Sequence, residues 1–186
     1  MLVLASASPR RQEILRNAGI EFVVQPTQIP EIPNLDEPAR EFAERMAREK
    51  ATIVSGERTQ DLVLGADTVV VVEGEILGKP ESPADAARML RLLSGRTHIV
   101  ITGVCLLGPE SGSDVRSETT LVTMLPIPEQ EILSYAASEE PKDKAGAYAI
   151  QGIASRWISR IEGDYFNVVG LPMSLVYKML RQHGAV

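Results

Sequence analysis

The chain opens with a short apolar stretch that passes directly into a helix start. Leu2–Ala5 is typical of a buried strand, and the segment ASASPRR at residues 5–11 continues from it. Ser8 is suited to the N-cap of a helix and Pro9 to its first turn, so a helix is predicted at Pro9–Ala18. A strand that hands over to a helix within a few residues favours an α/β fold.

Strand and helix signals continue along the chain. Further strands are expected at Glu21–Gln25, Leu62–Leu64, Val69–Val72, Glu75–Leu77, His98–Leu107, Val115–Leu125, Ala147–Ile150 and Trp157–Ile161. Further helices are expected at Glu37–Val54, Pro83–Leu93, Pro128–Ala137 and Pro172–Gln182. The two longest strands, joined by the polar loop Gly108–Asp114, favour an antiparallel pair. We therefore predict an α/β fold with a mixed, twisted sheet, and a single domain over residues 1–186 with two lobes around a cleft.

Composition excludes several classes of protein. A net charge of −6 and 4% aromatic residues argue against a general nucleic-acid coat or a base-stacking platform. No apolar run is long enough to span a membrane, no signal peptide is visible, and neither a Walker A loop nor a dinucleotide fingerprint occurs. The single cysteine, Cys105, lies in an apolar run and fits a reducing cytoplasm, which is the expected location.

The predicted first helix offers a place for an anion. Its first backbone N–H groups carry partial positive charge, and Arg10 and Arg11 add two full charges. Phosphate is the common biological anion at such a helix start. An ordinary capped helix with two solvated arginines explains the same residues equally well, and the heptad alone leaves both interpretations open.

Two carboxylates are candidates for a metal site. Asp67 follows the strand-like VLGA, where it would be held rigidly as a metal ligand or a general base. Glu31 stands between Pro30 and Pro33, and Mg²⁺ binds through one or two carboxylates together with substrate phosphates. The alternatives are a turn aspartate bonded to its own backbone and a solvated loop glutamate.

Three further polar residues are candidates for ligand contacts. Lys79 lies between a glycine and a proline that fix its backbone, and Lys50 lies in the long helix. Each would ordinarily be a surface lysine, and Lys79 is the more suggestive of the two. Gln151 lies at the end of a predicted strand, and its amide can both donate to and accept from a base edge such as that of uracil or thymine. The simpler interpretation is a strand-end glutamine bonded to a neighbouring loop.

Taken together, these segments resemble the Maf family of nucleoside triphosphate pyrophosphatases, long known as septum-formation inhibitors. The matching segments are ASASPRR, GADTVV, LGKP, LSGRTH, EPKDKAGAYAIQG and GDYFNVVGLP, in the family's order. The resemblance spans essentially the whole chain. It implies a fold similar to that of inosine triphosphate pyrophosphatases and hydrolysis between the α and β phosphates. It also implies a divalent metal cation, Mg²⁺ or Mn²⁺, and Asp67 as the proton acceptor.

The resemblance also assigns roles to polar residues. Positions linked to base selection in the branch that prefers dTTP and UTP match Arg10, Thr68 and Gln151. Phosphate-binding positions match Ser6, Arg11, Lys50 and Lys79. Metal ligands are expected at Glu31 and Asp67. The sister branch, which prefers 7-methyl-GTP, differs at the positions of Thr68 and Gln151. Two departures stand out: Ala149 replaces a usual glycine, and Pro30 precedes Glu31 where the family often has a second acid.

The expected function is therefore hydrolysis of dTTP and UTP to the monophosphate and pyrophosphate, which would prevent misincorporation and is linked by the family to cell-division arrest. Modified nucleotides such as 5-methyl-UTP are equally compatible substrates. The alternative is a non-catalytic nucleotide-binding regulator of septum formation. The resemblance implies a homodimer, and neither a nucleic acid nor a membrane is expected as a partner.

Overall fold

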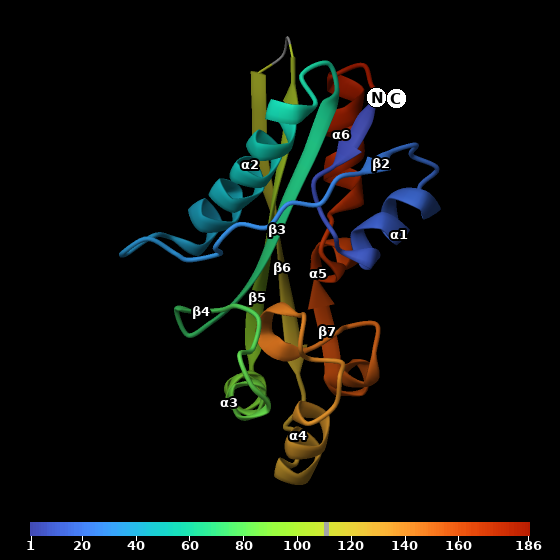
Figure 1. Ribbon diagram of the computed structural model, residues 1–186. Helices are drawn as coiled ribbons and strands as arrows, with labels where there is room; N and C mark the ends of the chain where they lie inside the picture. Colours follow the sequence, from blue (N-terminus) through green and yellow to red (C-terminus); the bar gives the residue numbers. More distant parts are fainter. Residues whose placement is uncertain (110–111) are drawn as a thin grey trace. The chain divides into compact units, whose positions relative to one another are not determined.

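The computed structural model describes residues 1–109 and 112–186 (Figure 1). The chain folds into two compact units. Unit 1 comprises Met1–Thr68, Thr102–Glu118 and Gly170–Val186, and unit 2 comprises Val69–Ile101 and Thr119–Val169. The predicted loop Gly108–Asp114 includes residues 110 and 111, which lie outside the described residues.

The elements follow the chain in an alternating order. Unit 1 holds β1 (Leu2–Leu4), α1 (Pro9–Asn17), β2 (Val23–Val24), α2 (Ala39–Glu57) and α6 (Met173–Gln182). Unit 2 holds β4 (Glu75–Leu77), α3 (Pro83–Leu93), α4 (Glu129–Ala136), η1 (Ala145–Ala147), η2 (Ile153–Trp157), β7 (Ile158–Glu162) and α5 (Tyr165–Val169). Three long strands, β3 (Leu62–Val72), β5 (Thr97–Gly108) and β6 (Gly112–Met124), contribute residues to both units.

The sheet is mixed, as predicted. Within the described ranges it has seven strands in the order β2-β1-β3-β5-β6-β7, with β4 paired to β3. Strand β1 is parallel to both β2 and β3, whereas the β3–β4 and β6–β7 pairs are antiparallel. The α/β class with a mixed sheet is confirmed. No helix in the described part of the chain is both long and apolar enough to cross a membrane.

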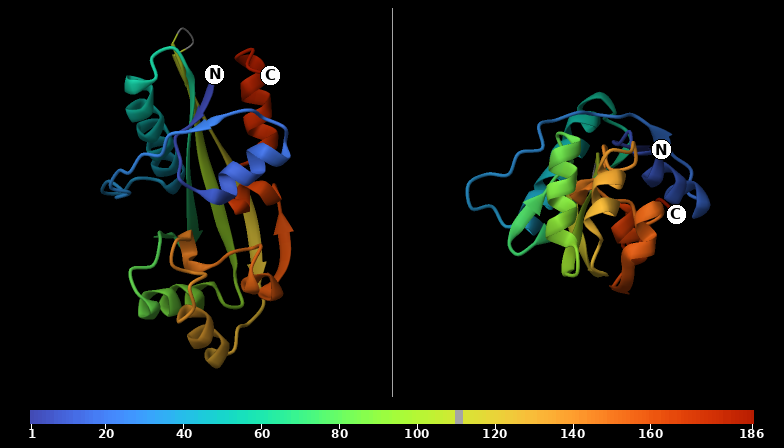
Figure 2. Two further views of the ribbon diagram at one scale, coloured as in Figure 1. Left: turned by 45° about the vertical axis from the view of Figure 1, so that its right-hand side comes forward. Right: turned by 90° about the horizontal axis from the view of Figure 1, so that it is seen from below.

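In unit 1, helix α2 packs directly on the sheet through glycines. A Cβ atom at Gly65 on β3 would lie 2.1 Å from the carbonyl oxygen of Ala47, and one at Gly103 on β5 would lie 2.3 Å from that of Ala43. The helix backbone therefore touches the strands, while α1 and α6 lie on the other side of them (Figure 2). This close approach brings α2 side chains to residues that follow Gly65 on β3.

The structure corrects one predicted strand. Residues 147–150 form the end of η1 and the start of a turn, not a strand. Gly146 has φ 68° and Ala147 has φ 59°, which is the left-handed region, and such a backbone cannot continue an extended ladder. The alternation of apolar residues in this segment reflects burial in a folded loop.

Two boundaries also differ from the prediction. Strand β3 does not stop before Asp67 but continues to Val72, so Asp67 lies within a strand. The long helix begins at Ala39 and not at Glu37, because Asp36 has φ 57° and Pro38 precedes the first turn. The side chain of Glu37 instead accepts a hydrogen bond from the backbone N–H of Asn34 at 2.8 Å.

Candidate active site

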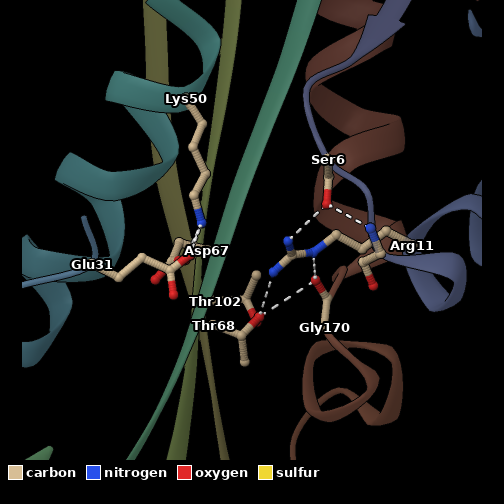
Figure 3. Close-up of polar contacts among 9 residues, drawn as sticks. Ser6, Arg11, Glu31, Lys50, Asp67, Thr68, Thr102 and Gly170 are labelled. Carbon is tan, nitrogen blue, oxygen red and sulfur yellow. Dashed lines mark hydrogen bonds and ion pairs between the residues drawn. The ribbon is translucent and has the colours of Figure 1, made fainter. Parts of the chain in front are cut away.

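Two carboxylates of unit 1 converge on one buried ammonium group. Lys50 Nζ lies 2.6 Å from Asp67 Oδ1 and 2.6 Å from Glu31 Oε1 (Figure 3). The side chains of Lys50 and Asp67 are only 8% and 7% exposed. The structure thus brings together the two predicted metal ligands, and it shows that Lys50 is no ordinary surface lysine.

Burial and charge act in opposite directions on Asp67. Removal from water is the largest influence and raises the pKa of the Asp67 carboxyl, and the nearby charge of Glu31 raises it further. The charges of Lys50 and Arg11 and the hydrogen bond from Lys50 lower it. A carboxylate under such competing influences is a candidate for proton transfer.

Arg11 is held by a three-part hydrogen-bond fork. Its Nε donates to the carbonyl oxygen of Gly170 at 2.8 Å, Nη1 to Ser6 Oγ at 3.1 Å and Nη2 to Thr68 Oγ1 at 3.1 Å (Figure 3). Burial lowers the pKa of Arg11, and the charges of Asp67 and Glu31 raise it. The guanidinium of Arg11 remains a cation beside the carboxyl groups of Asp67 and Glu31.

Ser6 and not Ser8 provides the hydroxyl at the start of α1. Ser8 occupies the N-cap position as predicted, but its side chain makes no capping hydrogen bond. The backbone N–H of Ser8 donates to Ser6 Oγ at 3.2 Å, so the Ser6 hydroxyl accepts from both this N–H and Arg11. Arg10, the neighbouring residue on α1, is partly exposed.

Two site residues escaped the sequence prediction. Thr102 on β5 is fully buried, and its hydroxyl lies 3.0 Å from Thr68 Oγ1. The signal for it was a hydroxyl residue inside the apolar run His98–Leu107. Gly170 has φ 121°, and its carbonyl oxygen accepts from Arg11. Its place in the turn before Pro172 gave no indication of this contact.

A second ion-pair network holds the segment that carries Glu31. Arg45 on α2 donates from Nη2 to the carbonyl oxygen of Ile32 at 3.0 Å. The same guanidinium contacts both carboxylate oxygens of Glu37 at 2.7 Å, and it contacts Glu49 at 3.0 Å. The residue adjacent to Glu31 is thus fixed to the helix that bears Lys50.

Lys79 and Gln151 belong to unit 2. Lys79 is exposed and follows β4, and Gln151 is exposed in a turn, not at the end of a strand as predicted. Because both residues lie outside unit 1, their participation in one site with Glu31, Lys50 and Asp67 stays a prediction.

The donor set fits a hard divalent cation that is completed by its substrate. Glu31 and Asp67 already converge on one cation, the Lys50 ammonium. The described residues contain no group of three or more His, Cys, Asp or Glu side chains that could cage a metal by themselves. Mg²⁺ commonly uses one or two carboxylates together with phosphates and water, so this pair matches its requirements.

Comparison with known proteins places the chain in a family. Residues 1–183 match the family described as Maf-like protein. The chain belongs to the Maf family. It is 53% identical over 185 residues to a protein of Koribacter versatilis named dTTP/UTP pyrophosphatase, covering 100% of this chain and 95% of the relative. It is 50% identical to a protein of the same name from Moorella thermoacetica, covering 98% and 95% of the two chains.

A solved structure supports the fold. The Ham1 protein of Staphylococcus aureus matches with a TM-score of 0.54 at 15% identity, covering 98% of both chains. This similarity confirms the predicted fold. Glu31, Lys50 and Asp67 lie on the segment before α2, on α2 and on β3, all inside the matched range.

Proposed function

We propose that this chain hydrolyses dTTP and UTP between the α and β phosphates, releasing the monophosphate and pyrophosphate. The observation that carries the proposal is the identity of about half of all residues, over nearly the full length, to relatives named dTTP/UTP pyrophosphatase. The arrangement of Glu31, Lys50 and Asp67 in unit 1 supports it. A buried carboxylate with a second carboxylate and fixed cations beside it suits hydrolysis of a metal-bound triphosphate.

Glu31 and Asp67 would hold the divalent cation. When bound, that cation would neutralise phosphate charge and polarise the phosphorus under attack. Asp67 would also orient the attacking water and accept its proton at a carboxylate oxygen, which its raised pKa favours. The ammonium of Lys50, released from part of its present pairing, would bind phosphate oxygens.

The remaining residues would bind and select the nucleotide. Arg11 and Ser6 form one fixed group of donors for phosphate oxygens at the start of α1. Arg10, Thr68 and Gln151 would select the base, and Lys79 would add positive charge near the phosphates. An amide such as that of Gln151 matches the mixed donor and acceptor edge of uracil and thymine.

A nucleotide panel tests the proposal. The purified chain is incubated with dTTP, UTP, 5-methyl-UTP, CTP, GTP and ATP, in Mg²⁺, in Mn²⁺ and after chelation. Pyrophosphate and orthophosphate are measured separately. We expect repeated turnover with pyrophosphate as the product from dTTP and UTP, and loss of turnover when the metal is chelated.

The product distinguishes the alternatives. Orthophosphate release would contradict cleavage between the α and β phosphates. Binding of one nucleotide per chain without turnover would contradict catalysis and support a regulator of septum formation. Turnover that chelation leaves unchanged would contradict the metal site at Glu31 and Asp67.

A further inference from the structure

In unit 2, the turn that carries Gln151 is tied at both ends to one pair of side chains. The backbone N–H of Gly152 donates to the carbonyl oxygen of Ala149 at 3.1 Å, which closes a four-residue turn with Gln151 at its third position. The N–H of Ala149 donates to Tyr135 Oη at 3.3 Å. The N–H of Ile153, just beyond the turn, donates to Glu140 Oε2 at 3.2 Å.

The two anchors are joined to each other. Tyr135 Oη donates to Glu140 Oε1 at 2.8 Å, so one chain of hydrogen bonds runs from Ala149 through Tyr135 to Glu140. The donor and the acceptor of each of these hydrogen bonds are fixed, because a carboxylate only accepts and a backbone N–H only donates. Glu140 therefore anchors both ends of the turn: it accepts directly from Ile153, and through Tyr135 it is linked to Ala149.

The surroundings make this arrangement rigid. Tyr135 on α4 is 3% exposed, and its ring meets that of Trp157 edge-on with centroids 5.2 Å apart. Glu140 approaches the turn so closely that a Cβ atom at Gly152 would lie 2.0 Å from Glu140 Oε1. The position of Gln151 is thus set by a buried ring, a carboxylate and a residue without a side chain.

We propose that Tyr135 and Glu140 are positioning residues that set the base selectivity of the enzyme by fixing Gln151. The inference rests on the proposed function, in which Gln151 contacts the base. An amide discriminates between bases only if its donor and acceptor are held in place, since a mobile amide pairs with either kind of edge. Gln151 itself is exposed, so its precision must come from the backbone beneath it.

The test measures kcat and KM for UTP and CTP in Tyr135→Phe, which keeps the ring and removes the hydroxyl. We expect the ratio of kcat/KM for UTP over CTP to fall about tenfold, as for the loss of one orienting hydrogen bond, through a higher KM for UTP. The kcat values should change little. Equal losses of kcat for both nucleotides would overturn the proposal in favour of a purely structural role.

A double-mutant cycle shows whether Tyr135 acts through Gln151. Gln151→Ala alone should reduce the UTP over CTP ratio, and adding Tyr135→Phe should reduce it no further. Fully additive losses would overturn the proposal. Glu129→Gln is the matched control, because Glu129 lies on the same helix α4 and pairs with Arg91 of α3 instead. It should leave the ratio unchanged.

Two further variants keep the test open if Tyr135→Phe does not fold. Glu140→Gln places an amide donor against one of its two donor partners, and Gly152→Ala forces Glu140 away. Either should lower the ratio and speed amide hydrogen exchange at Ala149 and Ile153.

If the unmodified chain hydrolyses no triphosphate, the proposed function fails. If it selects UTP and these variants select it equally well, the positioning role fails alone.

Discussion

Lys50 Nζ lies 2.6 Å from Asp67 Oδ1, and both side chains are almost fully buried. A buried ion pair of this kind is costly to form and more costly to break from one side. Glu31 lies 2.6 Å from the same ammonium, and the charge of Arg11 also acts on Asp67, so the pair belongs to a larger group of charges. Such groups are candidates for functional sites.

Asp67→Asn should abolish most activity while the fold persists. The amide keeps the size of the side chain, and Lys50 keeps Glu31 as its partner, but the proposed proton acceptor is lost. We expect pyrophosphate release to fall by at least about 100-fold, as is typical when a general base is removed. Circular dichroism checks the fold. Asp61→Asn, which alters a surface ion pair with Met1, is the control. Near-normal turnover in Asp67→Asn would refute the role.

Lys50→Met should destabilise the chain and make its stability depend on metal. Removal of the ammonium leaves two carboxylates facing each other, one of them buried, which should lower the free energy of unfolding by about 3 kcal/mol. Mn²⁺ should then raise the Tm of the variant more than that of the unmodified chain, because it replaces the lost cation. Lys178→Met, at an exposed position of α6, is the control.

That experiment has a clear contrary result. A Lys50→Met chain with unchanged Tm, and with no response to Mn²⁺, would show that Glu31 and Asp67 do not form a cation site. The readout is thermal unfolding, so it does not depend on any nucleotide or on catalysis.

Glu37→Gln should remove part of the acid sensitivity of the chain. Hydrogen bonds from Arg45 lower the pKa of Glu37 from 4.5 to about 2. Arg45 also contacts Glu49. A lowered pKa means that the ionised pair stabilises the fold fully above pH 4.5 and ceases to do so as the pH falls to about 2.

Urea unfolding at about pH 6 and about pH 3 measures this contribution. Between these values the unmodified chain should lose more stability than Glu37→Gln, whose amide does not titrate. Glu139→Gln, which alters an exposed ion pair with Lys142, should lose as much as the unmodified chain. Identical losses in Glu37→Gln and the unmodified chain would contradict the pKa argument.

The fold class could be predicted from the sequence because the spacing of apolar residues differs between strands and helices. Residues 147–150 were predicted wrongly, because the positive φ angles of Gly146 and Ala147 depend on tertiary packing and leave no period in the sequence. The long β3 strand was cut short for a related reason. A carboxylate inside a strand is unusual, and only the partner from α2 makes it tolerable.

Site residues that stand in sequence motifs could be predicted, whereas residues that join the site only through long-range contacts could not. Ser6, Arg11 and Asp67 stood in recognisable segments. Lys50 had an unused signal: it lies four residues after Met46 and four before Val54, on the buried stripe of α2. Arg45 had no such signal, because its role depends on the carbonyl oxygen of Ile32, which is a long-range contact.

The two arginines at the start of α1 should respond differently to substitution by lysine. Arg11 uses Nε, Nη1 and Nη2 on three different partners, and a lysine ammonium cannot reproduce that planar fork. Arg11→Lys should therefore lower the free energy of unfolding by about 2 kcal/mol and reduce turnover of every nucleotide alike. The proposed role of Arg10 is base selection, so Arg10→Lys should change which nucleotide is preferred. Thermal unfolding and kcat/KM for UTP and CTP measure both effects, and a changed preference in Arg11→Lys with none in Arg10→Lys would reverse the assignment.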